Sequence, residues 1–420
     1  MIRYISLFIS IILISFTSCV NTDVYSSEFT MRSDLSVEEK LEGFGAKKIY
    51  VDEPETYFAG ELWLEKLIEL TKESEDYILI STFLGSSSER TEPFYDLLCE
   101  KAESGVDVYL IIDGVSSYDM TASKDFLTPL YFLRESGVHL IEYSPITFTH
   151  LLSPHELMVR EHRKMFVFDG RKCAIGGMNI NYISIGSGEG GNQRDSMYLF
   201  SSTALSSALT DEFVNIWNEM SVEPLDRNDF ASYPESDTGS IPSYLFNQGP
   251  GGKTTIGELY ATLINSAQKE IDLIAFLPVY DDNMGDALRR AKERGVYIKV
   301  VVSTEARSFA GVTYMLPDLL EIADEVYLTS DDKEPLLHEK LMIVDDMYTV
   351  IGSVNFNYRS MGLSNEIALV LVSDEFALKE KAHLDERIAD GSERIYLEDA
   401  IALKKEHGSA FAYFLNFYGG

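Results

Sequence analysis

The most constraining feature of this sequence is a 21-residue pattern that occurs twice. Residues 162–182 read HRKMFVFDGRKCAIGGMNINY, and residues 338–358 read HEKLMIVDDMYTVIGSVNFNY. Both copies contain the pattern H-x-K-x4-D-x6-G-[GS]-x-N in full. A chain that repeats the same polar residues at the same spacing is expected to fold into two similar units.

The repetition extends upstream of this pattern. Residues 60–83 and 257–276 each predict a helix followed by a strand, because apolar residues at helical spacing precede a β-branched apolar run. Residues 103–113 and 293–303 each combine the end of a helix, a Gly stop and a buried strand. Near-continuous apolar strands are typical of a sheet with helices on both faces. The sequence therefore predicts an α/β protein with two similar α/β/α domains.

Composition sets the expected boundaries between segments. The stretch between the two copies is rich in Pro, Gly, Ser and Asp, which is typical of a linker. The C-terminal stretch AFAYFLNFYGG favours a core or interface segment over a lipid-binding wedge. The predicted segments are a signal peptide (1–18), a lipidated tether (19–45), a first domain (46–220), a linker (221–252) and a second domain (253–420).

The N-terminal residues, MIRYISLFISIILISFTSCV, predict export. An apolar run from Ile5 to Phe16 follows one Arg and precedes Thr17, Ser18 and Cys19, as in a signal peptide. The run is shorter than the ~20 apolar residues that span a bilayer. Small residues before a cysteine resemble a bacterial lipobox, so we expect a lipid on Cys19 and a location in the bacterial cell envelope. The alternative is a plain signal peptide with an incidental cysteine.

The net charge restricts the partners of the chain. It carries 35 Lys and Arg residues against 68 Asp and Glu residues, which gives a net charge of −33. Nonspecific nucleic-acid binding depends on neutralising phosphates with basic side chains, so nucleic acid is not expected as a partner. Anionic lipid surfaces would be repelled as well, so membrane attachment is expected from the lipid anchor. Any phosphate site must be a local region of positive charge.

Within each copy, the spacing predicts polar side chains on one side of a hairpin. Residues i and i+2 of a strand lie on one face, so each histidine is expected beside the lysine two positions later. The apolar runs then end at Asp-Gly and Asp-Asp, which predict turns. Turn tips at residues 170–171 and 346–347 would place an asparagine ~5 Å from each histidine across the hairpin. The predicted pairs are Asn179 with His162 and Asn355 with His338.

Two imidazoles, two ammonium groups and two amides suit a phosphodiester ligand. The ammonium groups would balance its charge and the amides would donate hydrogen bonds, while one imidazole attacks phosphorus and the other protonates the departing alcohol. Lysine is not an ordinary metal ligand, and no H-x-E, H-E-x-x-H or paired-cysteine pattern lies nearby. Neither a metal nor a cofactor is predicted. Because one copy holds one histidine of the pair, a complete site requires both copies.

The paired pattern resembles the HKD motifs of the phospholipase D superfamily, and the resemblance spans residues 46–375. It implies a pseudo-two-fold pair of α/β domains with one active site at their interface. By this resemblance His162 is the nucleophile that forms a phosphohistidine and His338 is the general acid and base, although these roles could be exchanged. It also implies that a carboxylate some way after each histidine orients the imidazole, and Asp195 and Glu366 stand 33 and 28 positions after.

The resemblance assigns ten site residues. The two aspartates of the repeated pattern are expected to support the turns rather than to touch substrate. The predicted residues are the catalytic set His162, Lys164, Asp169, His338, Lys340 and Asp345, the substrate-binding Asn179 and Asn355, and the imidazole-orienting Asp195 and Glu366.

Within the superfamily, the sequence resembles cardiolipin synthases and related phosphatidyltransferases. The stretches REHRKMFVFDGR, NQRDSMYL and GSVNFNYRSMGLSNE carry this resemblance, although Gln193 stands where the synthases have Trp. It implies a transferase with a phospholipid substrate and an alcohol or water as acceptor. The alternatives are a phospholipase D-type hydrolase, a nuclease and a noncatalytic lipid-binding lipoprotein. Nothing in the sequence indicates an oligomeric state.

Overall fold

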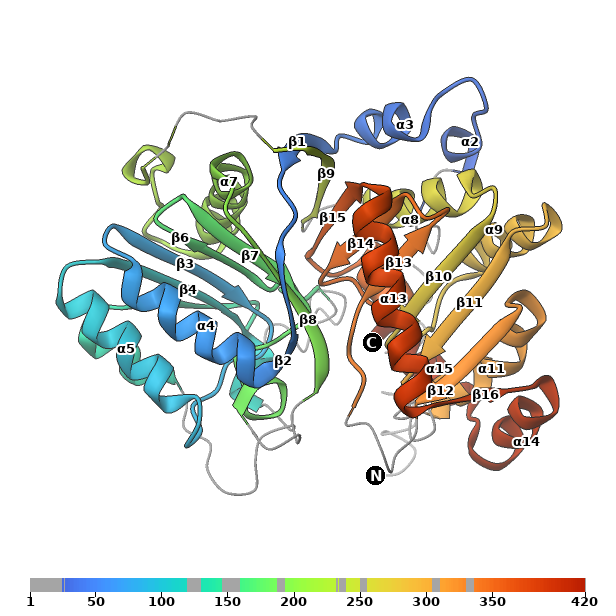
Figure 1. Ribbon diagram of the computed structural model, residues 1–420. Coiled ribbons are helices and arrows are strands. Elements are labelled where there is room, and N and C mark those ends of the chain that lie inside the picture. The colour runs from blue at the N-terminus through green and yellow to red at the C-terminus, as the bar shows by residue number, and fades with distance from the viewer. Residues whose placement is uncertain are drawn as a thin grey trace.

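Each copy of the repeated pattern belongs to its own β-sheet, and the two sheets lie side by side in the molecule (Figure 1). The computed structural model describes residues 25, 27–118, 130–145, 159–186, 193–231, 233, 239–249, 255–303, 310–329 and 336–419. The predicted signal peptide and Cys19 lie outside these residues. None of the helices in the described part of the chain has the length and apolarity needed to cross a bilayer.

The first sheet has seven strands in the order β2-β8-β7-β6-β3-β4-β5. Strands β3, β4 and β5 are parallel, whereas β6, β7 and β8 form an antiparallel meander. The bounds are β2 (Glu55–Ala59), β3 (Tyr77–Thr82), β4 (Asp107–Asp113), β5 (His139–Tyr143), β6 (Met165–Phe168), β7 (Lys172–Gly176) and β8 (Arg194–Phe200).

The second sheet has nine strands in the order β1-β9-β15-β14-β13-β10-β11-β12-β16. Without its two edge strands, β1 and β16, it repeats the strand order of the first sheet, which confirms the predicted α/β class with two similar halves. The bounds are β1 (Lys47–Val51), β9 (Ile241–Gln248), β10 (Glu270–Ala275), β11 (Tyr297–Val302), β12 (Glu325–Thr329), β13 (Leu341–Val344), β14 (Tyr348–Gly352), β15 (Glu366–Val372) and β16 (Ser392–Ile395).

Helices cover both faces of the sheets. Figure 1 shows α4 and α5 over the outer face of the first sheet, where Trp63 and Leu98 pack with Phe166. The inner faces share one core with α7 and α13, in which Phe213 and Phe376 are buried. The α-helices are α2 (Ser27–Thr30), α3 (Val37–Gly43), α4 (Gly60–Glu73), α5 (Glu92–Glu103), α7 (Thr203–Met220), α8 (Thr255–Ser266), α9 (Asp282–Glu293), α11 (Ala310–Ile322), α12 (Tyr358–Gly362), α13 (Asp374–Gly391), α14 (Leu397–His407) and α15 (Ala410–Gly419). The remaining helical turns are η1 (Gly114–Tyr118), η2 (Leu130–Ser136), η3 (Tyr182–Gly186) and η4 (Arg227–Asp229).

The predicted linker contains an interior strand of the second sheet. Residues 241–248, IPSYLFNQ, form β9 between β1 and β15. The Pro, Gly and Ser content around this stretch concealed a run of buried residues that includes Tyr244 and Phe246. Strand β1, at the start of the predicted first domain, likewise pairs with β9 in the second sheet. From β1 onward the chain therefore runs from the second sheet to the first and back, so the predicted boundaries at 46, 221 and 252 do not coincide with the sheets.

The two motif hairpins turn over three residues instead of two. Phe168 pairs with Lys172, and Val344 pairs with Tyr348. The predicted register was therefore wrong by one residue in both halves, and neither asparagine lies directly opposite its histidine. The reason is the turn conformation: Asp169, Gly170, Asp345 and Asp346 all have positive φ, between 51° and 65°. Asp and Gly tolerate this left-handed region better than most residues do.

The aspartate that opens each turn binds the backbone of a neighbouring strand. The Asp169 carboxylate accepts hydrogen bonds from the N–H groups of Glu75, Asp76 and Tyr77, at 2.9–3.0 Å. Asp345 accepts from three consecutive N–H groups in the same way, at 2.7–3.1 Å, where β10 begins. Both aspartates lie at the opposite end of their strand from the motif histidine, so they hold the hairpin and are not part of the candidate site.

This geometry predicts that Asp169→Ala lowers the free energy of unfolding by about 1–3 kcal/mol, because three backbone donors lose their acceptor. Urea denaturation would measure the change. Glu75→Ala, which removes an exposed carboxylate of the same segment, is the matched control and should have little effect. If Asp169→Ala instead left stability unchanged and removed activity, the structural role would be wrong.

Candidate active site

The two halves are joined by backbone hydrogen bonds that end at the motif histidines. The N–H group of His162 donates to the carbonyl of Asn365 at 3.0 Å, and the N–H group of His338 donates to the carbonyl of Arg194 at 2.7 Å. Each bond crosses between the halves. Asn365 and Arg194 directly precede the two residues predicted to orient the imidazoles. These backbone hydrogen bonds therefore place each histidine next to a carboxylate of the other half.

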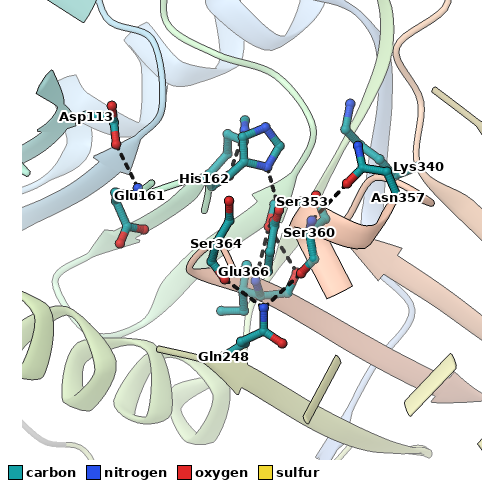
Figure 2. A network of polar contacts seen from close by, with 12 residues as sticks. Asp113, Glu161, His162, Gln248, Lys340, Ser353, Asn357, Ser360, Ser364 and Glu366 are labelled. Atoms are coloured by element: carbon teal, nitrogen blue, oxygen red, sulfur yellow. Dashed lines mark hydrogen bonds and ion pairs between the residues drawn. The ribbon is translucent and has the colours of Figure 1, made fainter. Parts of the chain in front are cut away.

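The imidazoles and carboxylates pair across the interface. His162 Nδ1 lies 2.8 Å from Glu366 Oε1, and His338 Nδ1 lies 2.6 Å from Asp195 Oδ2. Figure 2 shows the first of these pairs. The family resemblance implied a carboxylate in the same half as its histidine, and the structure shows the reverse pairing. A tautomer with its hydrogen on Nδ1, facing the carboxylate, leaves Nε2 with the lone pair for chemistry.

A small residue of the repeated pattern lies behind each carboxylate. A Cβ atom at Gly177 would lie 2.0 Å from Asp195 Oδ1, so this position must be glycine for the aspartate to fit. At the equivalent position the hydroxyl of Ser353 donates to Glu366 Oε2. The Gly-or-Ser position of the motif is thus explained by the carboxylate of the next strand.

Each lysine of the pattern lies beside its histidine. Lys164 Nζ donates to the carbonyl of His162 at 2.7 Å, and Lys340 Nζ donates to that of His338. Lys340 Nζ is also 3.9 Å from Asp195 Oδ2. All four side chains are buried, with 9% of His162 and 7% of His338 exposed. The two half-sites therefore bring two imidazoles and two ammonium groups into one region.

Two phenylalanines that the motif analysis did not select complete the half-sites. The Phe83 ring meets the His162 ring edge to face at 4.9 Å and lies 5.3 Å from Lys164 Nζ. Phe276 makes the same contacts with His338 and Lys340, at 4.5 Å and 5.5 Å. Both rings follow the first strand of their repeat. Phe83 and Phe276 are the last residues of the aligned stretches 60–83 and 257–276. This shared position was the sequence signal that could have identified them.

The asparagines of the pattern have different partners. Asn179 Oδ1 accepts from the N–H group of Leu84 at 3.1 Å, which directs its amide donors elsewhere. Asn355 is also buried. The next asparagine in each copy has a structural role: Asn181 and Asn357 cap the following turns. Asn179 and Asn355 are both buried and do not lie directly across the hairpin from the histidines, and their binding of substrate stays a prediction.

The middle residue of each H-x-K triplet is a buried charge that anchors its strand. Arg163 donates to Asn247 Oδ1 at 2.7 Å and to the Gln248 carbonyl at 2.8 Å, both on β9. Glu339 accepts from Arg387 on α13 at 2.7 Å. In Figure 2, Gln248 reaches the loop before Glu366, where its side chain donates to the carbonyls of Ser360 and Ser364. The strand inside the predicted linker thus supports the site.

Burial determines the pKa values of the site. It lowers the pKa of His162 well below its ordinary value, with Lys164 and Lys340 adding repulsion, and lowers that of His338 to about 4. Burial likewise lowers the pKa of Lys164 to about 7 and that of Lys340 to about 8, and it raises the pKa of Glu366 to about 7. The cationic forms are therefore costly until an anion enters, and both imidazoles are neutral at pH 7.

The described residues contain no group of three or more His, Cys, Asp and Glu side chains that could hold a metal ion. The two cysteines within that part of the chain, Cys99 and Cys173, are free thiols. The side chains that meet at the interface are instead those of an acid–base site with cationic neighbours.

Comparison with known proteins identifies the family. The family model described as "Cardiolipin synthase, PLD-like domain" matches residues 67–217 and 260–388, which is more than half of the chain and covers both motifs. The chain belongs to this phospholipase D-like family. The resemblance inferred from the paired motifs is thereby confirmed, and the two matched segments correspond to the two sheets.

Individual relatives of this phospholipase D-family chain are distant. A probable cardiolipin synthase of Bacillus subtilis, YwiE, is 27% identical over 333 residues, which is 78% of this chain and 64% of that protein. The cardiolipin synthase of Alkalihalophilus pseudofirmus is 27% identical over 326 residues, with 76% and 61% covered. The chain thus spans less than two thirds of the length of these relatives. The phosphatidylserine synthase structure of Haemophilus influenzae has the same fold, with a TM-score of 0.69, 15% identity, and coverage of 91% of this chain and 98% of that one.

The crossed pairing can be tested by the titration of single histidines. Since Asp195 favours the charged form of His338, Asp195→Asn should lower the His338 pKa further below about 4 and leave His162 unchanged. Nitrogen-15 NMR of histidine-labelled protein, assigned with His→Gln variants, would measure this. Glu366→Gln is the matched variant and should change His162 alone. A response of His162 to Asp195→Asn would contradict the pairing.

Proposed function

We propose that this chain is a phosphatidyltransferase of the cardiolipin synthase type. The observation that carries the proposal is the meeting of two imidazoles, each held at Nδ1 by a carboxylate of the other half, beside two buried lysines. The curated relatives of similar sequence are named cardiolipin synthases. In this proposal the substrate is a phospholipid and the phosphodiester occupies the space between the histidines.

In the first step, Nε2 of His162 attacks phosphorus. A phosphorus–nitrogen bond forms and the bond from phosphorus to the head-group oxygen breaks, while His338 transfers a proton to the departing alcohol. His338 can carry that proton because the phosphodiester anion counteracts the repulsion and burial that lower its pKa. Lys164, Lys340 and the amides of Asn179 and Asn355 bind the nonbridging oxygens. The exchange of roles between the histidines gives an equivalent scheme.

In the second step, an acceptor resolves the phosphohistidine. His338 removes the proton of an acceptor hydroxyl, the oxygen forms a bond to phosphorus, and the bond to His162 breaks. Glu366 stabilises the His162 imidazolium through its contact with Nδ1. When the acceptor is the glycerol head group of a second phosphatidylglycerol, the product is cardiolipin. The low exposure of both histidines supports an alcohol, because a buried site limits the access of water.

The alternative functions differ from this proposal in the acceptor, in the substrate, or in whether the protein catalyses a reaction at all. A phospholipase D-type hydrolase would use the same residues with water as the acceptor. The net charge of −33 disfavours a nuclease, because a nucleic acid is itself a polyanion. Both motifs are intact, which disfavours a noncatalytic lipoprotein.

Incubation with phosphatidylglycerol should yield cardiolipin and glycerol, separated by chromatography and mass spectrometry. His162→Ala and His338→Ala should each reduce turnover by at least about a thousandfold, because the two imidazoles act as a unit. His139→Ala, which removes an exposed histidine at the start of β5, is the control. Release of phosphatidic acid without cardiolipin would favour the hydrolase, and absence of a trapped phosphohistidine would overturn both enzymatic schemes.

We also propose that the chain is exported and anchored to a membrane of the cell envelope through a lipid on Cys19. The signal-like N-terminus and the small residues before this cysteine support the proposal. Metabolic labelling of producing bacteria with a radioactive fatty acid should label the protein, and Cys19→Ser should remove the label. A labelled Cys19→Ser variant, or an unlabelled wild type, would contradict the anchor.

A further inference from the structure

The C-terminal helix α15 presents aromatic and aliphatic side chains to the outside. Phe411 and Leu415, one helical turn apart, are 63% and 51% exposed. On its other side the helix is packed: the Phe417 ring stacks on Tyr358 of α12 at a centroid distance of 4.2 Å. A helix on a water-facing surface normally directs polar side chains outward. Helix α15 therefore has an apolar face on each side.

The attachment of α15 is firm, so the exposed side chains are held in place. Gly311 of α11 lies so close to the helix that an added Cβ would be 2.2 Å from Asn416 Oδ1 and 2.9 Å from the Ala412 carbonyl. The N–H group of Ser409 donates to the carbonyl of Ala310 at 3.0 Å. The exposure of Phe411 and Leu415 is therefore a property of how the helix packs.

The preceding helix α14 also exposes apolar side chains. It exposes Leu397 and Ile401, again one turn apart. Of the 13 large hydrophobic side chains that the structure describes as exposed, five lie between residues 396 and 415. Lys404 of α14 lies 3.9 Å from the centre of the Tyr314 ring, and that ring in turn contacts Tyr413 of α15. The exposed apolar side chains are thus concentrated on two adjoining helices.

The charge of this region differs from that of the whole chain. Helix α15 has no charged residue. Helix α14 carries Glu398 and Asp399 in its first turn, and Lys404, Lys405 and His407 beside Glu406 in its last turn. The two helices therefore have two lysines against three acidic residues, in a chain with a net charge of −33. Apolar side chains next to lysines suit the boundary between phospholipid head groups and acyl chains. An anionic lipid surface is therefore repelled less by this region than by the rest of the acidic chain.

Helix α15 also packs on the short helix α12, which follows the second motif. Tyr358, on which α15 stacks, lies between Asn357 and Arg359. Asn357 belongs to the second motif, and the Arg359 charge is close enough to lower the pKa of His162. A lipid surface that touched α15 would therefore meet a helix that packs directly on the segment following the second motif.

We propose that the outer face of α15, with Phe411 and Leu415, docks on a phospholipid bilayer and brings the candidate site to its substrate. This inference rests on the proposed lipid substrate. The sequence favoured a core or interface role for AFAYFLNFYGG. The structure divides the segment: Phe417 is in the core, and Phe411 and Leu415 face outward.

Tryptophan fluorescence of the full chain tests the docking without reference to activity. Phe411→Trp and Leu415→Trp are mixed with phosphatidylglycerol vesicles whose acyl chains carry bromine, which quenches tryptophan on contact. Leu378→Trp on α13, where the side chain is 53% exposed, is the matched control. The native Trp63 and Trp217 are buried and supply a background measured on the wild type. Docking predicts at least twofold quenching in the Phe411→Trp and Leu415→Trp variants and none in Leu378→Trp.

Equal quenching in all three variants, or none in Phe411→Trp and Leu415→Trp, would overturn the inference. A change in the emission of the Phe411→Trp variant with protein concentration, in the absence of vesicles, would also overturn it, since the face would then bind a second copy of this chain.

Turnover rates on two forms of the substrate distinguish a loss of membrane docking from a loss of catalysis. The double variant Phe411→Ser with Leu415→Ser should lose about tenfold in rate on phosphatidylglycerol vesicles and retain the wild-type rate on a short-chain phosphatidylglycerol below its micelle concentration. Equal loss on both substrates would overturn the inference. If the wild type turned over neither substrate, the proposed function would fail, and the quenching result would still decide whether the face docks.

Discussion

The candidate site depends on two hydrogen bonds that cross between the halves of the molecule. The N–H group of each motif histidine donates to the carbonyl that precedes the other half's carboxylate. These backbone bonds thus place each imidazole beside the carboxylate that it contacts. Because both bonds cross the same interface, any shift of one half against the other would disturb both pairs, and catalytic groups are sensitive to displacements of about 1 Å.

The same packing sets the electrostatics of the site. Burial costs charged groups much of their solvation, and here it moves histidines, lysines and Glu366 toward their neutral forms. A phosphodiester would bring one negative charge and several acceptor oxygens to this region, which compensates the buried cations. Under the proposed function, the charge of the anion would be compensated by groups buried within the site, although the chain as a whole is strongly acidic.

The halves are alike in strand order and unlike in detail. The first pairs Gly177 with the shorter Asp195, and the second pairs Ser353 with the longer Glu366. The strands that carry the histidines are also anchored differently, by Arg163 in one half and by Glu339 in the other. These differences give the two ends of the site unlike surroundings.

The sequence by itself determined the class of fold, the doubling and the two histidine–lysine pairs around which the candidate site is built, because helix and strand periodicity and motif spacing are local properties of a chain. Local properties of the chain do not show which distant segments meet in the fold. Which carboxylate meets which histidine depends on how the halves pack, so His338 with Asp195 was decided only by the tertiary structure. Strand β9 was concealed by the Pro, Gly and Ser residues around it, since its partners lie far away in sequence. The one-residue change of hairpin register accompanies turn residues with positive φ, and the aspartates of these turns also accept hydrogen bonds from a distant segment, which the turn sequence alone does not encode.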